Sequence, residues 1–256
     1  MKRLYHLSSC CVLVFFFFSF AQAQEKQTSQ QFVIFEEMVF PSKWVKYGQV
    51  QNKFFELWDK HEVDIPLITY RTTDYGVFWV IPIDNFASLD KIYGDMNKVW
   101  AKMNEEDGFD ALKEFRDLAT NKQMTIMHLP QLSYHKGSKI RSLEEAPYCE
   151  WTFVYLKNGH TNEIARAIMD YQKFYDEIPE SYDWDVYAVT FGGNDTPCWI
   201  IVSRAENEIA MRQSEEVLYE KYDKKIAELW SALIKHVRKI ENRSGWYAPD
   251  WSRINN

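Results

Sequence analysis

Phe78-Trp79-Val80-Ile81 recurs 120 residues later as Cys198-Trp199-Ile200-Ile201, and this repetition decides the fold. Pro130-Gln131-Leu132-Ser133 likewise recurs as Pro249-Asp250-Trp251-Ser252, 119 residues further on. Tyr70 and Tyr187 are a third matched pair, 117 residues apart, and the small drift falls where a hairpin loop can absorb it. Two half-chains with the same pattern in the same order predict one fold used twice.

Each half predicts the element order β-α-β-β-α-β, because short β-favouring runs alternate with apolar residues spaced by three or four. The first half predicts strands at 31–38, 66–72, 77–83 and 124–129, and helices over 41–57 and 89–103, the second resuming after Gly108. The second half predicts strands at 150–156, 184–191, 197–203 and a short one at 246–249, and helices over 164–175 and 218–237.

This order is that of the split βαβ, or ferredoxin-like, module, whose sheet carries helices on one face. The strands nevertheless carry bulky apolar side chains on both parities, since Phe78 and Val80 alternate with Trp79 and Ile81. A sheet that is apolar on both faces must bury both. We therefore expect an α+β protein of two tandem ferredoxin-like modules, residues 24–134 and 149–256, joined by a linker at 135–148. The modules should pack sheet to sheet as a pseudo-twofold α/β barrel.

The N-terminus has the three parts of a secretory signal peptide. Lys2 and Arg3 precede a short apolar run, and Ala21-Gln22-Ala23 follows it. The run is too short for the roughly 20 residues of a membrane-spanning helix, although an uncleaved anchor is the alternative. We expect residues 1–23 to be removed and the mature chain to be exported, to a periplasm or outside the cell, with no membrane span.

The charge of the chain argues against nucleic acid as a partner. The formal net charge is −7, and loss of the two N-terminal bases makes it more negative. An acidic surface repels phosphate backbones. Of the four cysteines, only Cys149 and Cys198 survive cleavage. They should lie at opposite ends of an antiparallel strand pair, so we expect two buried thiols, with a disulfide as the alternative.

Two ferredoxin-like modules packed in this way resemble the dimeric α/β-barrel superfamily, here in a fused tandem form, NIPSNAP-like or monooxygenase-like. The resemblance rests on element order and internal repetition, over nearly all of the mature chain. It implies a family that includes antibiotic-biosynthesis-type monooxygenases, small isomerases and haem-dependent dechlorinating and peroxidase enzymes. Fold by itself does not carry function.

Several side chains are candidates for a ligand site between the two sheets. His128 lies within a predicted strand and is either a haem or metal ligand or a hydrogen-bonded core histidine. Glu36 and Arg71 would meet inside the barrel as a polar anchor, or as a structural ion pair. The aromatic candidates, which could equally be core, are Tyr70, Trp79, Tyr187 and Trp199. No histidine or cysteine cluster has metal-ligand spacing, so we predict no metal site.

These observations favour an exported, non-catalytic protein that binds a small apolar ligand or a partner in or near the inter-sheet space. No cofactor is predicted. One alternative is a monooxygenase or isomerase on the same barrel, either independent of cofactors or dependent on haem, with His128 or Glu36 as base. The other is a purely structural envelope protein.

Overall fold

The computed structural model of the protein describes residues 29–136, 141–180, 182–193 and 195–254. The predicted signal peptide, residues 1–23, and part of the predicted linker, residues 137–140, lie outside the described residues. Within the described ranges, no helix is both long and apolar enough to cross a membrane.

Strands and helices follow one another twice in the predicted order. The first half contains β1 (Gln31–Val39), η1 (Pro41–Lys43), α2 (Trp44–Lys60), β2 (Ile68–Thr72), β3 (Gly76–Ile83), α3 (Ala87–Asp107), α4 (Ala111–Glu114) and β4 (Ala119–His128). The second half contains β5 (Tyr148–Leu156), α5 (Thr161–Glu177), β6 (Trp184–Gly192), β7 (Cys198–Ala205), α6 (Glu208–Ile234), β8 (Val237–Tyr247) and η3 (Pro249–Trp251).

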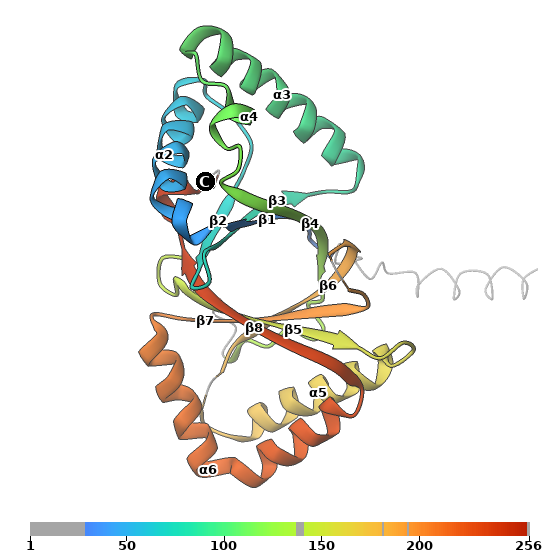
Figure 1. The fold of residues 1–256 in the computed structure, drawn as a ribbon. Coiled ribbons are helices and arrows are strands. Elements are labelled where there is room, and N and C mark those ends of the chain that lie inside the picture. The colour runs from blue at the N-terminus through green and yellow to red at the C-terminus, as the bar shows by residue number, and fades with distance from the viewer. Residues whose placement is uncertain (1–28, 137–140, 181, 194, 255–256) are drawn as a thin grey trace, which may run out of the picture.

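Eight antiparallel strands close into one barrel, in the order β1-β3-β2-β8-β5-β7-β6-β4 (Figure 1). Each half contributes its strands in the same spatial order: fourth, first, third, second. The halves join where β2 pairs with β8 and where β4 pairs with β6, so closure leaves no strand edge exposed for pairing with another chain. The predicted α+β class and the sheet-to-sheet barrel are therefore confirmed.

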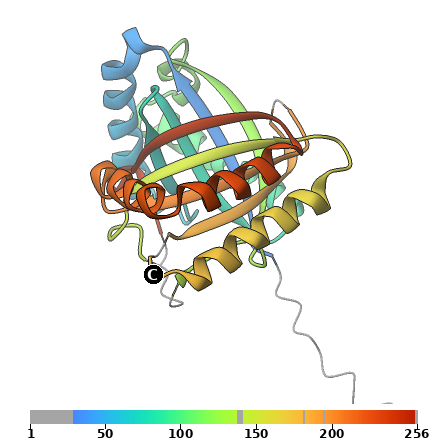
Figure 2. The same cartoon turned by 90° about the horizontal axis from the view of Figure 1, so that it is seen from below.

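Helices cover the outside of the barrel in two groups. Helices α2, α3 and α4 lie over the first half, and α5 and α6 lie over the second (Figure 1). The turned view shows α5 and α6 crossing the outer face of the second half's strands (Figure 2). The pleat then sends Trp79 and Ile81 outward to the helices and Phe78 inward. The three largest apolar clusters lie beneath each helix group and inside the barrel.

The last strand, β8, is much longer than predicted. It runs over 11 residues, from Val237 to Tyr247, where the sequence predicts a short strand at 246–249. Most of its side chains are polar, and it is held by a backbone ladder to β5 that extends from Tyr148 to Leu156. Backbone hydrogen bonds leave no hydrophobic pattern in the sequence, which is why the strand escapes a pattern-based prediction.

Both cysteines in the described part of the chain are free, as predicted. In the β5–β7 pair, Cys149 lies opposite Arg204 and Cys198 lies opposite Tyr155, so the thiols sit at opposite ends of the ladder. Burial raises the pKa of each thiol to about 12. Both are therefore neutral and unreactive at physiological pH.

Candidate functional site

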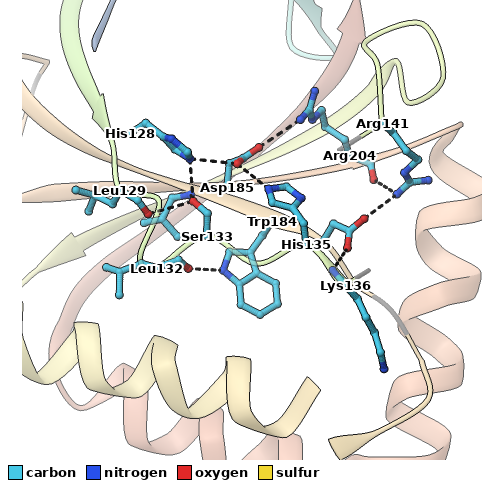
Figure 3. A network of polar contacts seen from close by, with 12 residues as sticks. His128, Leu129, Leu132, Ser133, His135, Lys136, Arg141, Trp184, Asp185 and Arg204 are labelled. Carbon is cyan, nitrogen blue, oxygen red and sulfur yellow. Dashed lines mark hydrogen bonds and ion pairs between the residues drawn. The ribbon is translucent and has the colours of Figure 1, made fainter. Parts of the chain in front are cut away.

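Three of the predicted site residues meet at one end of the barrel. Tyr70 and Tyr187 face its interior and line a cavity of about 150 Å³. The His128 ring lies 5.1 Å from the Tyr187 ring, and its Nε2 atom lies 2.9 Å from Ser133 Oγ and 3.2 Å from Asp185 Oδ1. Figure 3 shows His128 and Arg204 on either side of Asp185.

The predicted contact between Glu36 and Arg71 is not made. Glu36 does point into the barrel, but its partner is Arg243 of β8, at 2.6 Å. Arg71 points outward, where its guanidinium lies 3.7 Å from the centre of the Trp251 ring and pairs with Asp250. The pleat explains the difference, because Arg71 follows Tyr70, which takes the inward position on β2.

Trp79 and Trp199 lie on the outer faces of the two sheets. Trp79 packs beneath the first helix group, and its indole Nε1 donates a hydrogen bond of 3.0 Å to Glu37. Trp199 packs in the corresponding cluster of the second half. The structure therefore places both in helix-covered cores, while neither is among the residues that line the barrel cavity.

A large hollow lies between the second half's sheet and its helices. This sheet–helix cavity has a volume of about 760 Å³, within the range usual for ligand sites. Its floor is the outer face of β5, β7 and β8, with Thr152, Ile201 and Asn242, and its roof comes from α5 and α6. Aromatic side chains in the wall are Tyr171, Tyr175, Tyr182, Trp184, Tyr219 and Trp230.

The floor of this cavity is polar where the first half is apolar. Val33 pairs with Ile81 in the first sheet, and both are buried. Thr152 pairs with Ile201 at the repeat-related place in the second sheet. Polar groups under a helix layer are costly unless they find partners. A ligand with oxygen or nitrogen atoms would supply them.

One end of the cavity holds two carboxylates on a single arginine. Arg212 contacts Glu150 through both terminal nitrogens and Glu215 through Nη1, at 2.8 Å. Tyr182 donates a hydrogen bond of 3.1 Å to Glu215. The hydrogen bond to Glu215 raises the pKa of the guanidinium, so it stays cationic. One positive charge against two negative ones leaves a net negative charge at this end.

Three tyrosines of the wall keep their hydroxyl protons. Burial raises the pKa values of Tyr171, Tyr175 and Tyr182 above the ordinary tyrosine value. The hydroxyls of Tyr171 and Tyr175 can donate to a substrate oxygen, while that of Tyr182 already donates to Glu215. None of the three ionises at neutral pH. Together with the polar floor, these tyrosines give the cavity an aromatic lining that also contains hydrogen-bond donors.

The residues of the cavity do not fit haem, the cofactor of the haem-dependent alternative. Haem iron is held by histidine, cysteine, methionine or an ionised tyrosine. Among the described residues that line the cavity there is no histidine, cysteine or methionine, and burial keeps Tyr171, Tyr175 and Tyr182 neutral by raising their pKa values. The part of the chain that the structure describes also contains no group of three or more His, Cys, Asp or Glu residues placed to bind a metal ion.

Sequence reasoning did not single out Glu150, Arg212 or Glu215. A signal was available in the repeat itself. The offset of 120 residues between Trp79 and Trp199 places Ser203 against Ile83, and the strand ladders place Thr152 against Val33. Thr152 and Ser203 are polar where the first half has apolar core residues. This difference indicates that the space beneath the helices of the second half is not filled by apolar side chains.

Comparison with known proteins finds similar structures only. No family model matches the sequence, and no curated protein does. An anthrone oxidase-like protein matches with a TM-score of 0.62 at 12% identity, over 87% of this chain and 92% of that one. A provisionally assigned monooxygenase from Lactobacillus acidophilus NCFM gives 0.50 at 9% identity, over 86% and 94%. A provisionally assigned chlorite dismutase gives 0.53 at 11% identity, over 88% and 97%.

At such identities the likeness shows the fold, the α+β barrel that monooxygenase-like and chlorite dismutase-like proteins share. It also overturns the leading prediction from the sequence. The similar structures are named for oxidase, monooxygenase and dismutase enzymes, so the prediction of a non-catalytic protein that binds an apolar ligand is wrong. The enzyme alternative fits these findings better.

Proposed function

We propose that the protein is an oxygenase that needs no haem and oxidises a multi-ring aromatic compound carrying hydroxyl or keto groups. The observation that carries this proposal is the sheet–helix cavity, whose aromatic wall, polar floor and surplus carboxylate suit such a substrate. The cavity is large enough for several fused rings. The names of the similar structures, an anthrone oxidase-like protein among them, support the same class of reaction.

Glu215 is the general base in this proposal. Arg212 holds Glu150 through two nitrogens and Glu215 through one, so Glu215 is the less neutralised carboxylate. It removes a proton from a substrate CH₂ group that is activated by a carbonyl conjugated with it through the aromatic rings. The resulting enolate oxygen accepts hydrogen bonds from the neutral hydroxyls of Tyr171 and Thr152, which stabilise the developing charge.

The oxidant is molecular oxygen. The electron-rich enolate carbon is oxidised by O₂ and a carbon–oxygen bond forms. The resulting hydroperoxide then loses water, which takes the remaining hydrogen from that carbon, and a second carbonyl is formed. Overall, one CH₂ group and one O₂ give one C=O group and one H₂O. The apolar part of the wall, with Leu218, Ile226 and Leu233, keeps bulk water from the enolate.

Oxidation of anthrone to anthraquinone tests this proposal, because the product absorbs differently from the substrate and O₂ uptake can be followed in parallel. We expect the protein to accelerate both well above autoxidation. Glu215→Gln should lower the rate about a hundredfold or more, the usual worth of a general base. Glu228→Gln, on the exposed i,i+3 pair with Lys225, is the matched control and should keep full activity. No acceleration, or equal losses in both variants, would overturn the proposal.

We further propose that the chain is a fused counterpart of a two-subunit barrel, with modules at 24–134 and 149–256. The identical strand order of the two halves supports this. Export after removal of residues 1–23 also remains a proposal, and it rests on the N-terminal sequence. The intact mass of protein from its native source tests it, since cleavage predicts a chain that begins at Gln24.

A further inference from the structure

We propose that the barrel end containing Arg204 is a second ligand site, separate from the sheet–helix cavity, and that it takes an aromatic carboxylate with a single ring. The two sites use opposite faces of β7. Ile201 and Ser203 face the sheet–helix cavity, while Ile200, Val202 and Arg204 face the barrel. Neither the base nor the oxidant of the proposed reaction takes part here.

The size of the barrel cavity selects a single ring. Its volume is about 150 Å³, and an apolar protein cavity of roughly this size is known to hold benzene. Most of its walls are aromatic or aliphatic, so a ring is favoured over a polar chain. The wall residues include Phe32, Ile34, Phe78, Trp151, Phe153 and Ile200.

Arg204 supplies the charge that such a ligand requires. Its side chain is 19% exposed, and among the described residues its guanidinium has one side-chain hydrogen bond, a long one of 3.3 Å to Asp185. A guanidinium carries five N–H donors, in a geometry that matches a carboxylate. Interaction with nearby Tyr70 and Asp185 raises the pKa of Arg204 despite burial, so it stays cationic. Most of its donors are therefore available to a ligand.

Two histidines also contact Asp185, the carboxylate that Arg204 meets among the described residues. Asp185 Oδ1 lies 3.0 Å from His135 Nε2 and 3.2 Å from His128 Nε2, and Asp185 Oδ2 faces Arg204 (Figure 3). A carboxylate oxygen only accepts, so both imidazoles donate to it. Asp185 thus accepts hydrogen bonds from three side chains, and its negative charge is shared between Arg204 and the two histidines.

Tyr70 and Tyr187 add neutral donors to the same end. Burial raises the pKa values of both, so both keep their hydroxyl protons. Both line the cavity, and each interacts electrostatically with Arg204. A carboxylate at Arg204 would accept from the guanidinium and from these hydroxyls, while its ring filled the apolar cavity. A neutral ring would leave most of the guanidinium donors without an acceptor in a largely nonpolar place, because Asp185 takes only one of them.

Calorimetric titration of the whole chain with benzoate tests the site, with benzamide as the uncharged analogue of the same shape. We expect benzoate to bind at least about tenfold more tightly than benzamide, as for a ligand that gains charge-assisted hydrogen bonds. Acetate, which has the charge without the ring, should bind more weakly than benzoate. Equal affinities for benzoate and benzamide would overturn the proposal.

Variants locate the binding. Arg204→Gln should weaken benzoate binding by about tenfold or more, the loss expected when charged hydrogen bonds are removed. Val202→Phe should block benzoate by filling the cavity while leaving the guanidinium in place, and it covers the case in which Arg204→Gln does not fold. Arg212→Gln, in the sheet–helix cavity, should leave benzoate affinity unchanged. Loss of binding in Arg212→Gln, or full binding in Val202→Phe, would contradict the proposal without touching the proposed oxygenase activity.

Discussion

Ser133 and Ser252 make the same pair of hydrogen bonds, and one bond of each pair joins the serine to the opposite half of the chain. Ser133 Oγ accepts from the backbone N–H of Val186 at 2.9 Å, and Ser252 Oγ accepts from that of Thr69 at 2.9 Å. Each hydroxyl also donates to a backbone carbonyl four residues earlier. The two repeated segments that begin with proline, residues 130–133 and 249–252, therefore connect each half of the chain to the other by hydrogen bonds.

Replacing either serine by alanine should destabilise the barrel. Ser133→Ala and Ser252→Ala each leave a backbone N–H without its partner, at a cost of about 1–3 kcal/mol. The two sites lie in different halves, so the losses should add in the double variant. Urea unfolding measures them, with Ser214→Ala on the exposed face of α6 as a control that should change little. A double variant as stable as either single one would show that the segments do not fasten the halves.

The fold could be predicted because its information is local and repeated. The run from Phe78 to Ile81 is apolar on both parities, and the same run returns at 198–201, so two mutually shielding sheets follow. The position of an ionised side chain is less predictable. The sequence predicts that Glu36 and Arg71 meet inside the barrel, yet the partner of Glu36 is Arg243, 207 residues away. Which residue of a pleated strand points inward is decided by register, and register is set by distant backbone pairing.

The Glu36–Arg243 pair should be costly to break and less costly to replace. The Glu36 side chain is 7% exposed and would be a poorly compensated buried charge without Arg243, whereas Arg243 also pairs with Asp74, at 2.9 Å. Arg243→Leu should destabilise by about 3–5 kcal/mol, as for other broken buried pairs. Adding Glu36→Leu should recover part of that loss. Chemical unfolding of the two single variants and the double variant measures these losses. If the double variant lost more stability than the two single variants together, an unpaired charge would not be the cause.

Replacing Thr152, in the polar floor of the sheet–helix cavity, should lower activity without lowering the stability of the fold. No hydrogen bond is recorded for the Thr152 hydroxyl among the described residues, and its repeat-related residue is Val33. Thr152→Val keeps the side-chain shape and should leave the free energy of unfolding within about 1 kcal/mol of wild type. Turnover of anthrone should fall because the enolate loses a donor. Unchanged turnover would remove Thr152 from the proposed site.

Asp185 should give the barrel an acid-sensitive contribution. Burial pushes its pKa upward, but hydrogen bonds from His128 and His135 and the charge of Arg204 outweigh this, and the net pKa is lowered. A carboxylate with a lowered folded-state pKa stabilises the protein above its unfolded-state value, and that stability is lost as pH falls through the folded pKa. Asp185→Asn should therefore be less stable than wild type near neutral pH. The gap should close below about pH 4, near the ordinary aspartate pKa. Unfolding curves over this range would contradict the prediction if the gap stayed constant.

Ferric haem should not bind specifically to the sheet–helix cavity, although the volume of the cavity would admit it. Iron requires a protein ligand, and the described lining residues include no histidine, cysteine or methionine, while burial raises the pKa values of Tyr171, Tyr175 and Tyr182 and keeps them neutral. Titration with haem should give the spectrum of free or loosely adsorbed haem, without a sharp Soret band that saturates at one equivalent. Leu218→His places an imidazole in the roof on α6 and should create such a band if the cavity is otherwise accessible. A saturating band in the wild-type protein would show instead that a residue outside the described lining reaches the iron, and the haem-free reaction would then have to be abandoned.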